Sequence, residues 1–247
     1  MPKEDIAILS ALLRNARHVV MFTGAGISAE SGIPTFRDAM TGLWAQYNPE
    51  ELATPEAFEK NPKLVWDWYQ WRRALIKQAN PNAGHLAVVA MSRQIPRFDL
   101  ITQNVDGLHQ RAGSENVIEL HGNIHRNHCS DPNCGGIRSE DESETPPRCE
   151  RCGSFLRPSV VWFGESLPTK ALNQAQLAAQ ECDVFFSVGT SSLVYPAADL
   201  PFLAARANAT VVQINPAPTS LDQVAEFNLH GKAGEILPAL VKSAWEG

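Results

Sequence analysis

A glycine-rich segment near the start of the chain has the residue types and the spacing of a phosphate-binding turn. Residues 24–38 read GAGISAESGIPTFRD and directly follow an apolar run at residues 19–22. Gly24, Gly26 and Ala29 match the Gly-x-Gly-x-x-Gly/Ala spacing that lets a strand-to-helix turn approach the pyrophosphate of a dinucleotide. Amides at the start of the following helix would then face the anion. The spacing alone also fits an ordinary glycine turn, so the flanking residues must distinguish a dinucleotide site from such a turn.

The residues after these glycines differ from those of an ordinary dehydrogenase. Gly32 and Pro34 interrupt the helix that a dehydrogenase would continue at this point. Phe36 and Arg37 follow directly. The pattern predicts a loop that covers the dinucleotide and carries an aromatic ring and a guanidinium group.

Four cysteines have the spacing of a structural zinc site. Four residues separate Cys129 from Cys134, two separate Cys149 from Cys152, and 14 lie between the pairs. Two such pairs supply the four thiolates of a tetrahedral zinc ion, whereas the alternative of two disulfides is disfavoured in a cytosolic protein. Because protein fills all four positions, we expect one structural zinc per subunit. Cys182 is expected to be a small buried apolar residue.

Polar residues follow four predicted strands, at the edge where open α/β sheets bind ligands. They are Gln103, Asn104 and Asp106 after residues 98–102, His121 after 117–120, Gly189, Thr190 and Ser191 after 184–188, and Asn215 after 210–214. Each of these on its own also fits a capped turn. Their occurrence at equivalent ends of one sheet instead predicts a binding site, in which hydroxyls and amides meet a phosphate and Asn215 meets a ribose hydroxyl.

His121 is the candidate general base. The chain has 7 histidines, and a lone histidine is more often structural than catalytic. His121 differs because Asn104 and Asp106 end the neighbouring strand, and an imidazole that titrates near neutral pH suits proton abstraction from a ribose hydroxyl. The other histidines lack such neighbours or fall in helical or loop segments, and we interpret them as structural.

The strands that must position these residues are short, apolar and separated by segments long enough to form helices. Predicted strands span residues 19–22, 98–102, 117–120, 184–188 and 210–214, and residues 6–13 form a first amphipathic helix. Near-continuous Val, Ile and Phe content indicates strands buried on both faces. We therefore expect an α/β fold with a Rossmann-like parallel sheet and helices on both faces, formed by residues 1–41, 83–123 and 157–247.

Two stretches depart from that pattern and are expected to form a small domain. Residues 42–82 are rich in Trp, Tyr and Leu at helical spacing and contain no strand candidate, so we expect a helical insertion. Residues 124–156 contain the four cysteines around an acidic, proline-rich middle that cannot build a core of its own. This second stretch is expected to be a zinc-binding module.

Bulk composition disfavours two classes of function. The formal net charge is −6, which argues against a nucleic-acid-binding face and suits a basic peptide partner. No apolar stretch approaches the roughly 20 residues that a membrane span needs. The first residues lack the basic start and apolar core of a signal peptide, so a cytoplasmic protein is expected.

Together these motifs resemble those of the sirtuin family of NAD-dependent protein lysine deacylases, in its bacterial type. The resemblance extends over nearly the whole chain: residues 24–38, 102–106, 121–122, the four cysteines, 160–164, 189–191 and 212–215. The order and combination of these motifs are highly specific. Val105 stands where isoleucine is common in the family, a difference of one methylene.

The resemblance implies a reaction that cleaves NAD rather than one that passes a hydride. The acyl oxygen of an acylated protein lysine would attack the nicotinamide ribose and expel nicotinamide. His121 would then activate a ribose hydroxyl, and the products would be free lysine and O-acyl-ADP-ribose. Phe36 would keep water from the reacting carbon, and the substrate backbone would pair with Val161, Phe163 and Gly164 as an added strand.

The resemblance also assigns residues to the NAD site. Asn104 and Asp106, which the resemblance counts with His121 as catalytic, would hold the nicotinamide ribose and carboxamide. Ser28 would contact that ribose, and Arg37 would lie against the pyrophosphate. The adenosine side would be lined by Gly189, Thr190, Ser191, Asn215 and Ala233. The implied set of NAD-contacting residues is Gly24, Ala25, Gly26, Ile27, Ser28, Phe36, Arg37, Gln103, Asn104, Val105, Asp106, Gly189, Thr190, Ser191, Asn215, Pro216, Ala217 and Ala233. No direct contact with nucleic acid or membrane is implied.

Two residues of the predicted helical insertion indicate which acyl group is removed. Tyr69 and Arg72 are three residues apart and face the same side of a helix, where a phenol and a guanidinium can bind a carboxylate. Helical pattern alone favours a core tyrosine and a surface arginine. However, Tyr-x-x-Arg together with Ala29 and Glu30 resembles the sirtuin branch that removes succinyl and malonyl groups. Arg73 is expected to face solvent, and deacetylation is expected to persist.

Two other functions use the same cofactor pocket. A protein ADP-ribosyltransferase would add the mass of ADP-ribose to its acceptor instead of removing an acyl group. A non-enzymatic NAD sensor that docks partners through its zinc module would bind NAD without releasing nicotinamide. A hydride-transfer enzyme is the weakest alternative, because no acidic residue ends a second strand about 20 residues after the glycines.

Overall fold

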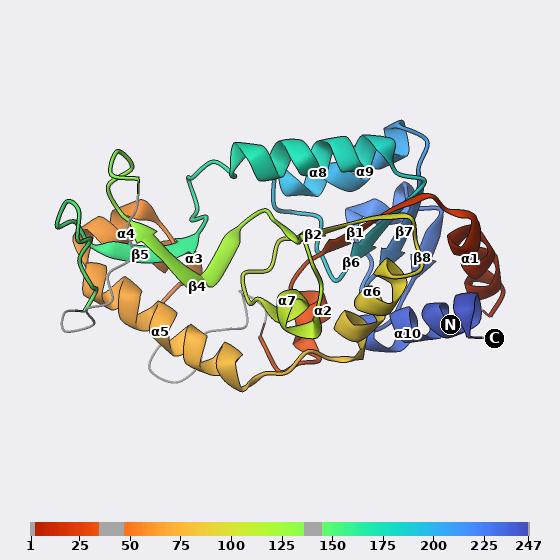
Figure 1. The fold of residues 1–247 in the computed structure, drawn as a ribbon, viewed down its shortest axis with the longest axis horizontal. Helices are drawn as coiled ribbons and strands as arrows, with labels where there is room; N and C mark the ends of the chain where they lie inside the picture. The colour runs from red at the N-terminus through yellow and green to blue at the C-terminus, as the bar shows by residue number, and fades with distance from the viewer. Residues whose placement is uncertain (1–2, 35–46, 136–144, 247) are drawn as a thin grey trace.

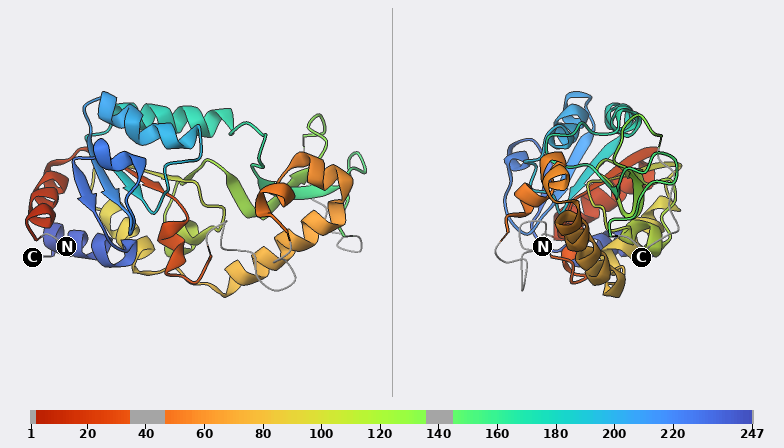
Figure 2. Two further views of the ribbon diagram at one scale, coloured as in Figure 1. Left: turned by 180° about the vertical axis from the view of Figure 1, so that it is seen from behind. Right: turned by 90° about the vertical axis from the view of Figure 1, so that its left-hand side faces the viewer.

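The computed structural model describes residues 3–34, 47–135 and 145–246, and the structural statements below concern these ranges. Phe36 and Arg37, which are predicted to cover the dinucleotide, lie outside them. The molecule is elongated: a sheet with helices on both faces forms one end, where both termini lie, and α3, α4, α5, β4 and β5 form the other (Figure 1). The view from behind shows the same two regions (Figure 2). None of the helices in these ranges combines the length and the apolar character needed to cross a bilayer.

The large region is built on a six-stranded parallel sheet. In spatial order its strands are β3 (Ile118–Glu119), β2 (Arg97–Thr102), β1 (His18–Thr23), β6 (Val184–Val188), β7 (Thr210–Ile214) and β8 (Phe227–Leu229). The five strands expected from the sequence are confirmed, whereas β8, with only three residues, is too short to give a periodic signal. The strand order reverses between β1 and β6. In open α/β sheets the carboxyl ends of the strands at such a reversal form the ligand crevice.

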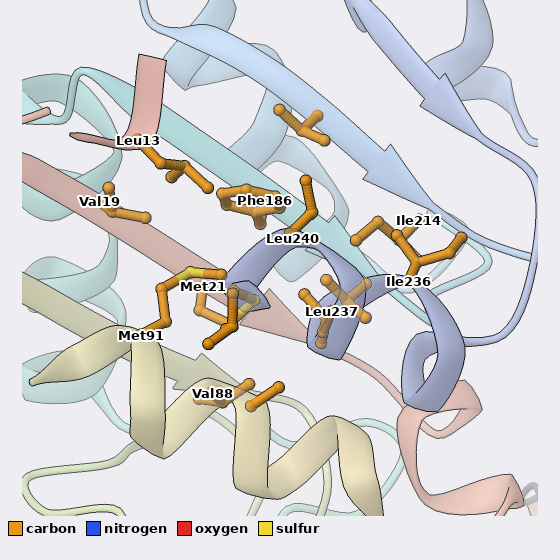
Figure 3. Packing of buried hydrophobic residues seen from close by; sticks show 14 of the residues in the cluster. Leu13, Val19, Met21, Val88, Met91, Phe186, Ile214, Ile236, Leu237 and Leu240 are labelled. Atoms are coloured by element: carbon orange, nitrogen blue, oxygen red, sulfur yellow. The ribbon is translucent and has the colours of Figure 1, made fainter. Parts of the chain in front are cut away.

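Helices cover both faces of this sheet, so the predicted fold class is confirmed. On one face lie α1 (Lys3–Asn15), α6 (Ala83–Ser92) and α10 (Ala233–Trp245), and on the other lie α8 (Thr169–Glu181) and α9 (Leu200–Arg206) (Figure 1). Met21 and Phe186 of the sheet pack with Leu237 and Leu240 of α10 and with Val88 of α6 (Figure 3). Every residue of β1 and β6 is buried, which is why both strands have nearly continuous apolar sequences.

Short elements connect the strands at the carboxyl edge of the sheet. They are α2 (Gly26–Ala29) after β1, α7 (Leu108–Ala112) after β2, and two short 3-10 helices, η2 (Ala197–Asp199) after β6 and η3 (Ser220–Gln223) after β7. Helix α2 ends at Ala29, with Glu30 as its C-cap, ahead of Gly32, which has a φ of +78°. The interruption of the helix predicted from Gly32 and Pro34 is therefore confirmed.

The small region has an apolar cluster of its own. It contains α3 (Pro49–Leu52), α4 (Pro55–Lys60), α5 (Pro62–Gln78) and the antiparallel strands β4 (Gly122–Cys129) and β5 (Leu156–Val160). The sequence predicts these helices but not the two strands. The ring of Trp162, just after β5, lies 5.4 Å from that of Phe58 and 6.3 Å from that of Tyr69, between centroids. The helices and the cysteine-bearing hairpin thus share one core.

Capping residues explain where three of the helices begin. Thr54 opens α4 and Asn61 opens α5, and their side chains accept from the N–H groups of Ala57 and Leu64, both at 3.1 Å. A proline occupies the first turn after each cap, where its missing N–H costs nothing. Asn82 likewise caps α6 through its side chain, although no proline follows it.

The predicted exposure of Arg73 is wrong. Its Nε donates to the carbonyl of Ile124 at 2.6 Å, and its Nη2 donates to Asn127 Oδ1 at 2.5 Å. Its guanidinium carbon also lies 5.3 Å from the ring centroid of Trp66. One step along a helix turns a side chain by about 100°, so Arg73 points in a different direction from Arg72. It contacts β4, a strand that the sequence does not predict.

Candidate functional site

Two glycine turns interlock at the carboxyl ends of β1 and β6. The N–H of Gly24 donates to the carbonyl of Val188 at 2.9 Å, and the N–H of Gly26 donates to that of Gly189 at 2.8 Å. A Cβ atom on Gly26 would lie 2.6 Å from the Cα of Gly189, and Gly189 itself has a φ of +61°. These glycines therefore allow two backbone turns to touch. The sequence spacing assigns them only to the approach of a pyrophosphate.

A polar network extends from this turn to the end of β2. The Ser28 hydroxyl donates to Asp106 Oδ2 at 2.8 Å. The Asn104 amide donates to the Gly24 carbonyl and to Ser28 Oγ, each at 3.1 Å. Asp106 is buried, and its second oxygen accepts the N–H of Leu108 at 2.8 Å. The structure thus brings together the three residues that the resemblance assigns to the nicotinamide ribose.

His121 lies between β3 and β4, next to the end of β2. Its Nδ1 hydrogen-bonds to the carbonyl of Gln103 at 2.9 Å. Because a carbonyl can only accept, Nδ1 carries the proton and Nε2 of the neutral ring is an acceptor. Burial lowers the pKa of His121, and the bond to Gln103 partly offsets this effect. A neutral imidazole with an accepting Nε2 is the form that a general base requires.

The residues predicted for the adenosine side follow β6 and β7. Thr190 is buried and accepts from the Gln103 amide at 3.0 Å, a bond that joins the ends of β6 and β2. Ser191 is exposed. The Asn215 amide donates to the carbonyl of Ala217 at 2.8 Å and so shapes the turn after β7.

The other members of the predicted NAD set differ in exposure. Ile27 is fully buried and Ala233, at the start of α10, is 5% exposed. Each would therefore meet a ligand through its backbone. Ala25 is half-buried and Pro216 is exposed. Val105 packs against the aromatic cluster of the small region, which places it where the two regions meet.

Two buried histidines support the site, although the sequence marks them only as structural. The rings of His85 and His109 meet edge to face, with centroids 4.9 Å apart. His109 Nε2 and Thr23 Oγ1 form a hydrogen bond of 3.0 Å, and Thr23 donates to Thr102 Oγ1 at 2.9 Å, which joins the ends of β1 and β2. Burial lowers the pKa of His109 to about 3, so the ring is neutral. No spacing in the sequence signals this link, which is made through Thr23 and Thr102 in the folded protein.

The four clustered cysteines form a compact donor set. The sulfurs of Cys129, Cys134, Cys149 and Cys152 all lie within 4.8 Å of one another, and none of them is in a disulfide. The disulfide alternative is therefore wrong. Four sulfurs about 2.3 Å from a zinc ion would be roughly 3.8 Å apart, and two of the pairs measure 3.4 and 3.6 Å. The set fits a structural zinc. Cys182 is buried, as predicted, and burial raises its pKa to about 12.

Tyr69 and Arg72 face the same side of α5. The Arg72 guanidinium carbon lies 5.4 Å from the Tyr69 ring centroid and 5.0 Å from that of Trp68. Tyr69 is 2% exposed, and its oxygen accepts the indole N–H of Trp162 at 2.9 Å. Burial lowers the pKa of Arg72, while Tyr69 and the Asp106 carboxylate raise it. Arg72 is thus half-buried, with its guanidinium lying over the rings of Trp68 and Tyr69.

The segment predicted to pair with a substrate strand follows β5. The N–H of Val161 donates to the carbonyl of His121, and that of Phe163 donates to Ala53, both at 2.9 Å. These two N–H groups are used within the protein, so an added strand would pair through other backbone groups of the segment. Gly164 has a φ of +85°, and the Phe163 side chain is 45% exposed. An open groove of about 620 Å³ between β4, β5 and the segment before α8 includes Val161 in its wall.

Comparison with known proteins gives matches over both regions. The profile of the Sir2 family matches residues 24–196. The chain is 54% identical over 243 residues to an NAD-dependent protein deacylase of Methylococcus capsulatus, which covers 95% of each chain. It is similar to a Sir2 homolog–NAD complex, with a TM-score of 0.89, 45% identity, and 97% of this chain and 93% of that chain covered. It is also similar to Sir2Af2 bound to a myristoylated histone peptide, with a TM-score of 0.78, 36% identity, and 99% and 98% covered.

Proposed function

Because this chain belongs to the Sir2 family and is an NAD-dependent protein deacylase, we propose that it removes succinyl and malonyl groups from protein lysines and also acts on acetyl groups. The reaction forms O-acyl-ADP-ribose. The observation that carries the proposal is the pairing of Tyr69 and Arg72 on one side of α5, with the guanidinium of the half-buried Arg72 over the Tyr69 ring.

This pair has the chemistry of a carboxylate receptor. A guanidinium donates through a planar fork that matches the two oxygens of a carboxylate. Arg72 is half-buried over two aromatic rings, unlike the exposed arginine that helical pattern alone favours. Tyr69 accepts from Trp162, and its own O–H can donate to the acyl carboxylate. An ion pair in such a partly buried position is stronger than one in bulk water.

We place NAD across the interlocked glycine turns, with its nicotinamide ribose next to the network of Ser28, Asn104 and Asp106. Ser28 and Asn104 are held by bonds to Asp106 and to the Gly24 carbonyl, so their positions are set before NAD binds. His121 then accepts a ribose hydroxyl proton at Nε2, while its Nδ1 stays bound to a backbone carbonyl.

The acylated lysine is proposed to enter between the two regions as part of an extended peptide. Backbone groups around Gly164 would pair with it, and the exposed Phe163 ring would pack against its side chains. The net charge of −6 favours peptides with basic residues around the modified lysine. Free thiols in a metal-binding set and the use of NAD support a reducing, cytoplasmic setting.

The test replaces Arg72 with methionine and measures kcat/KM on matched succinyl-lysine and acetyl-lysine peptides. Loss of a charge-assisted, two-oxygen contact is expected to lower desuccinylation by about 100-fold. Deacetylation should change by less than about threefold, because an acetyl group offers no carboxylate.

Arg73→Met provides the matched control on the same helix. Arg73 binds the backbone and Asn127 of β4, so its loss should affect both peptides equally. Equal losses on both peptides in Arg72→Met would show that Arg72 supports the fold and is not a receptor for the acyl carboxylate.

A further inference from the structure

Asn82 makes two sets of hydrogen bonds, with two different elements. Its Oδ1 caps α6 by accepting from the N–H groups of Gly84 at 2.9 Å and His85 at 3.4 Å. Its Nδ2 donates to the Ile27 carbonyl at 2.7 Å and to Ser31 Oγ at 2.9 Å. A single side chain thus joins the start of α6 to α2, the helix that begins in the glycine-rich turn.

The geometry of α2 depends on such contacts. The helix has four residues, which is too short to be stable by itself. Asn104 holds it from the side of the polar network, through the Gly24 carbonyl and Ser28. From the side of α10, the N–H of Gly234 donates to Glu30 Oε1 at 2.9 Å. Asn82 supplies the tether from α6.

The cap and the tether use different atoms of Asn82. Ser and Asp are N-caps of about the same quality as Asn, so α6 alone does not require an amide at this position. Only an amide can accept at Oδ1 for the cap and also donate through Nδ2 to a carbonyl on another element. Capping of α6 therefore does not account for the two hydrogen bonds that Nδ2 donates.

We infer that Asn82 is a positioning residue for NAD, which acts by holding α2 so that Ser28 and the amides of the turn face the dinucleotide. The inference rests on the placement of NAD proposed above. It assigns Asn82 no proton transfer and no contact with the acyl group. Its loss should therefore change the affinity for NAD and leave the affinity for the acylated peptide as it is.

Asn82→Ser keeps the cap acceptor and removes the amide donors. With two hydrogen bonds lost at about 1 kcal/mol each, KM for NAD should rise by about 10- to 30-fold. KM for the peptide at saturating NAD should stay within about twofold. Asn82→Asp should raise KM for NAD at least as much, because a carboxylate oxygen would face the Ile27 carbonyl. A purely structural defect would instead reduce the folded fraction, which lowers kcat and leaves both Michaelis constants unchanged.

Two further variants make the result decisive. Asn61→Ser changes the cap of α5, for which the described residues show only the bond from Leu64, and should alter neither Michaelis constant. Ser28→Ala removes a group assigned to the ribose and should raise KM for NAD. If Ser28→Ala raises this constant and Asn82→Ser does not, the role of Asn82 is disproved and the NAD site stands. If neither variant raises it, both the placement of NAD at this turn and the role of Asn82 are disproved.

Discussion

The two regions of the molecule are stabilised in different ways. The carboxyl edge of the large sheet lies between two extensive apolar clusters, and its turns are joined by bonds such as those of Gly26 with Gly189 and Asn104 with Gly24. In the small region, the aromatic cluster covers one end of β4 and β5. At the other end, the buried cluster consists of three cysteines and Leu156.

This difference separates the small region, which needs a metal, from the edge of the sheet, where the proposed catalytic residues lie. The edge of the sheet is determined by many hydrogen bonds between elements that are already packed, so we expect its geometry not to depend on zinc. The tip of the hairpin has too little apolar surface to fold unaided, and zinc would supply the missing stability. Substitutions in the two regions should therefore impair different properties of the protein.

The largest effect is expected at the proposed general base in the large region. His121→Tyr and His121→Asn should each lower deacylation by about a thousandfold, because general-base catalysis contributes on the order of 10²–10⁴. Asn can still donate to the Gln103 carbonyl, so it preserves the local bond while it removes the base. Formation of the deacylated lysine peptide and zinc content are the two measurements.

Zinc content should remain at one ion per chain in both His121 variants, since the cysteine cluster belongs to the other region. A variant that deacylates at the native rate would eliminate His121 as the base. A variant that loses both activity and zinc would show that the two regions are not independent, and the comparison above would fail.

A smaller effect is expected when the zinc set is broken. Cys149→Ser removes one of the buried sulfurs and should lower the metal content strongly. Deacylation should fall by about 10- to 100-fold as the hairpin loosens around Ile124 and Val160, which pack in the aromatic cluster. NAD affinity, measured by calorimetry, should change by less than about threefold. Cys182→Ala, in the large region, is the matched control and should keep its zinc. A large loss of NAD affinity in Cys149→Ser would contradict the proposed independence.

The sequence predicts the large region better than the small one, for a physical reason. Strands such as residues 184–188 are buried on both faces, so their apolar runs are visible without knowledge of any neighbour. Strand β4 contains histidine, arginine and asparagine because several of its positions are exposed, and β5, although mostly buried, contains Arg157, which pairs with Glu165. Their positions follow from the cysteines and not from hydrophobic periodicity.

The same distinction applies to the site. The glycines and the polar strand ends can be found by spacing, since parallel strands bring their carboxyl ends to one edge. The contacts of Arg73 with β4 and of Asn82 with α2 cannot be found in this way, because each joins an element to a partner far away in the sequence. Such side chains have ordinary local roles, a helical surface and a helix cap, and only the tertiary structure shows the second one.

The smallest expected effect is a pH dependence that distinguishes the two regions without any substitution. Burial lowers the pKa of His121 below its ordinary value of 6.5, so the neutral, accepting form persists as the pH falls through that value. We expect kcat/KM for deacylation to be level from about pH 8 to 7, to fall less than about twofold by pH 6.5, and then to decline with the slope of one proton. Protonation of the zinc thiolates would instead give a steeper loss accompanied by release of metal. Measuring rate and bound zinc in the same samples separates these causes: a half-maximal rate at or above pH 6.5 with zinc fully bound would show that the group controlling the reaction is not the buried His121.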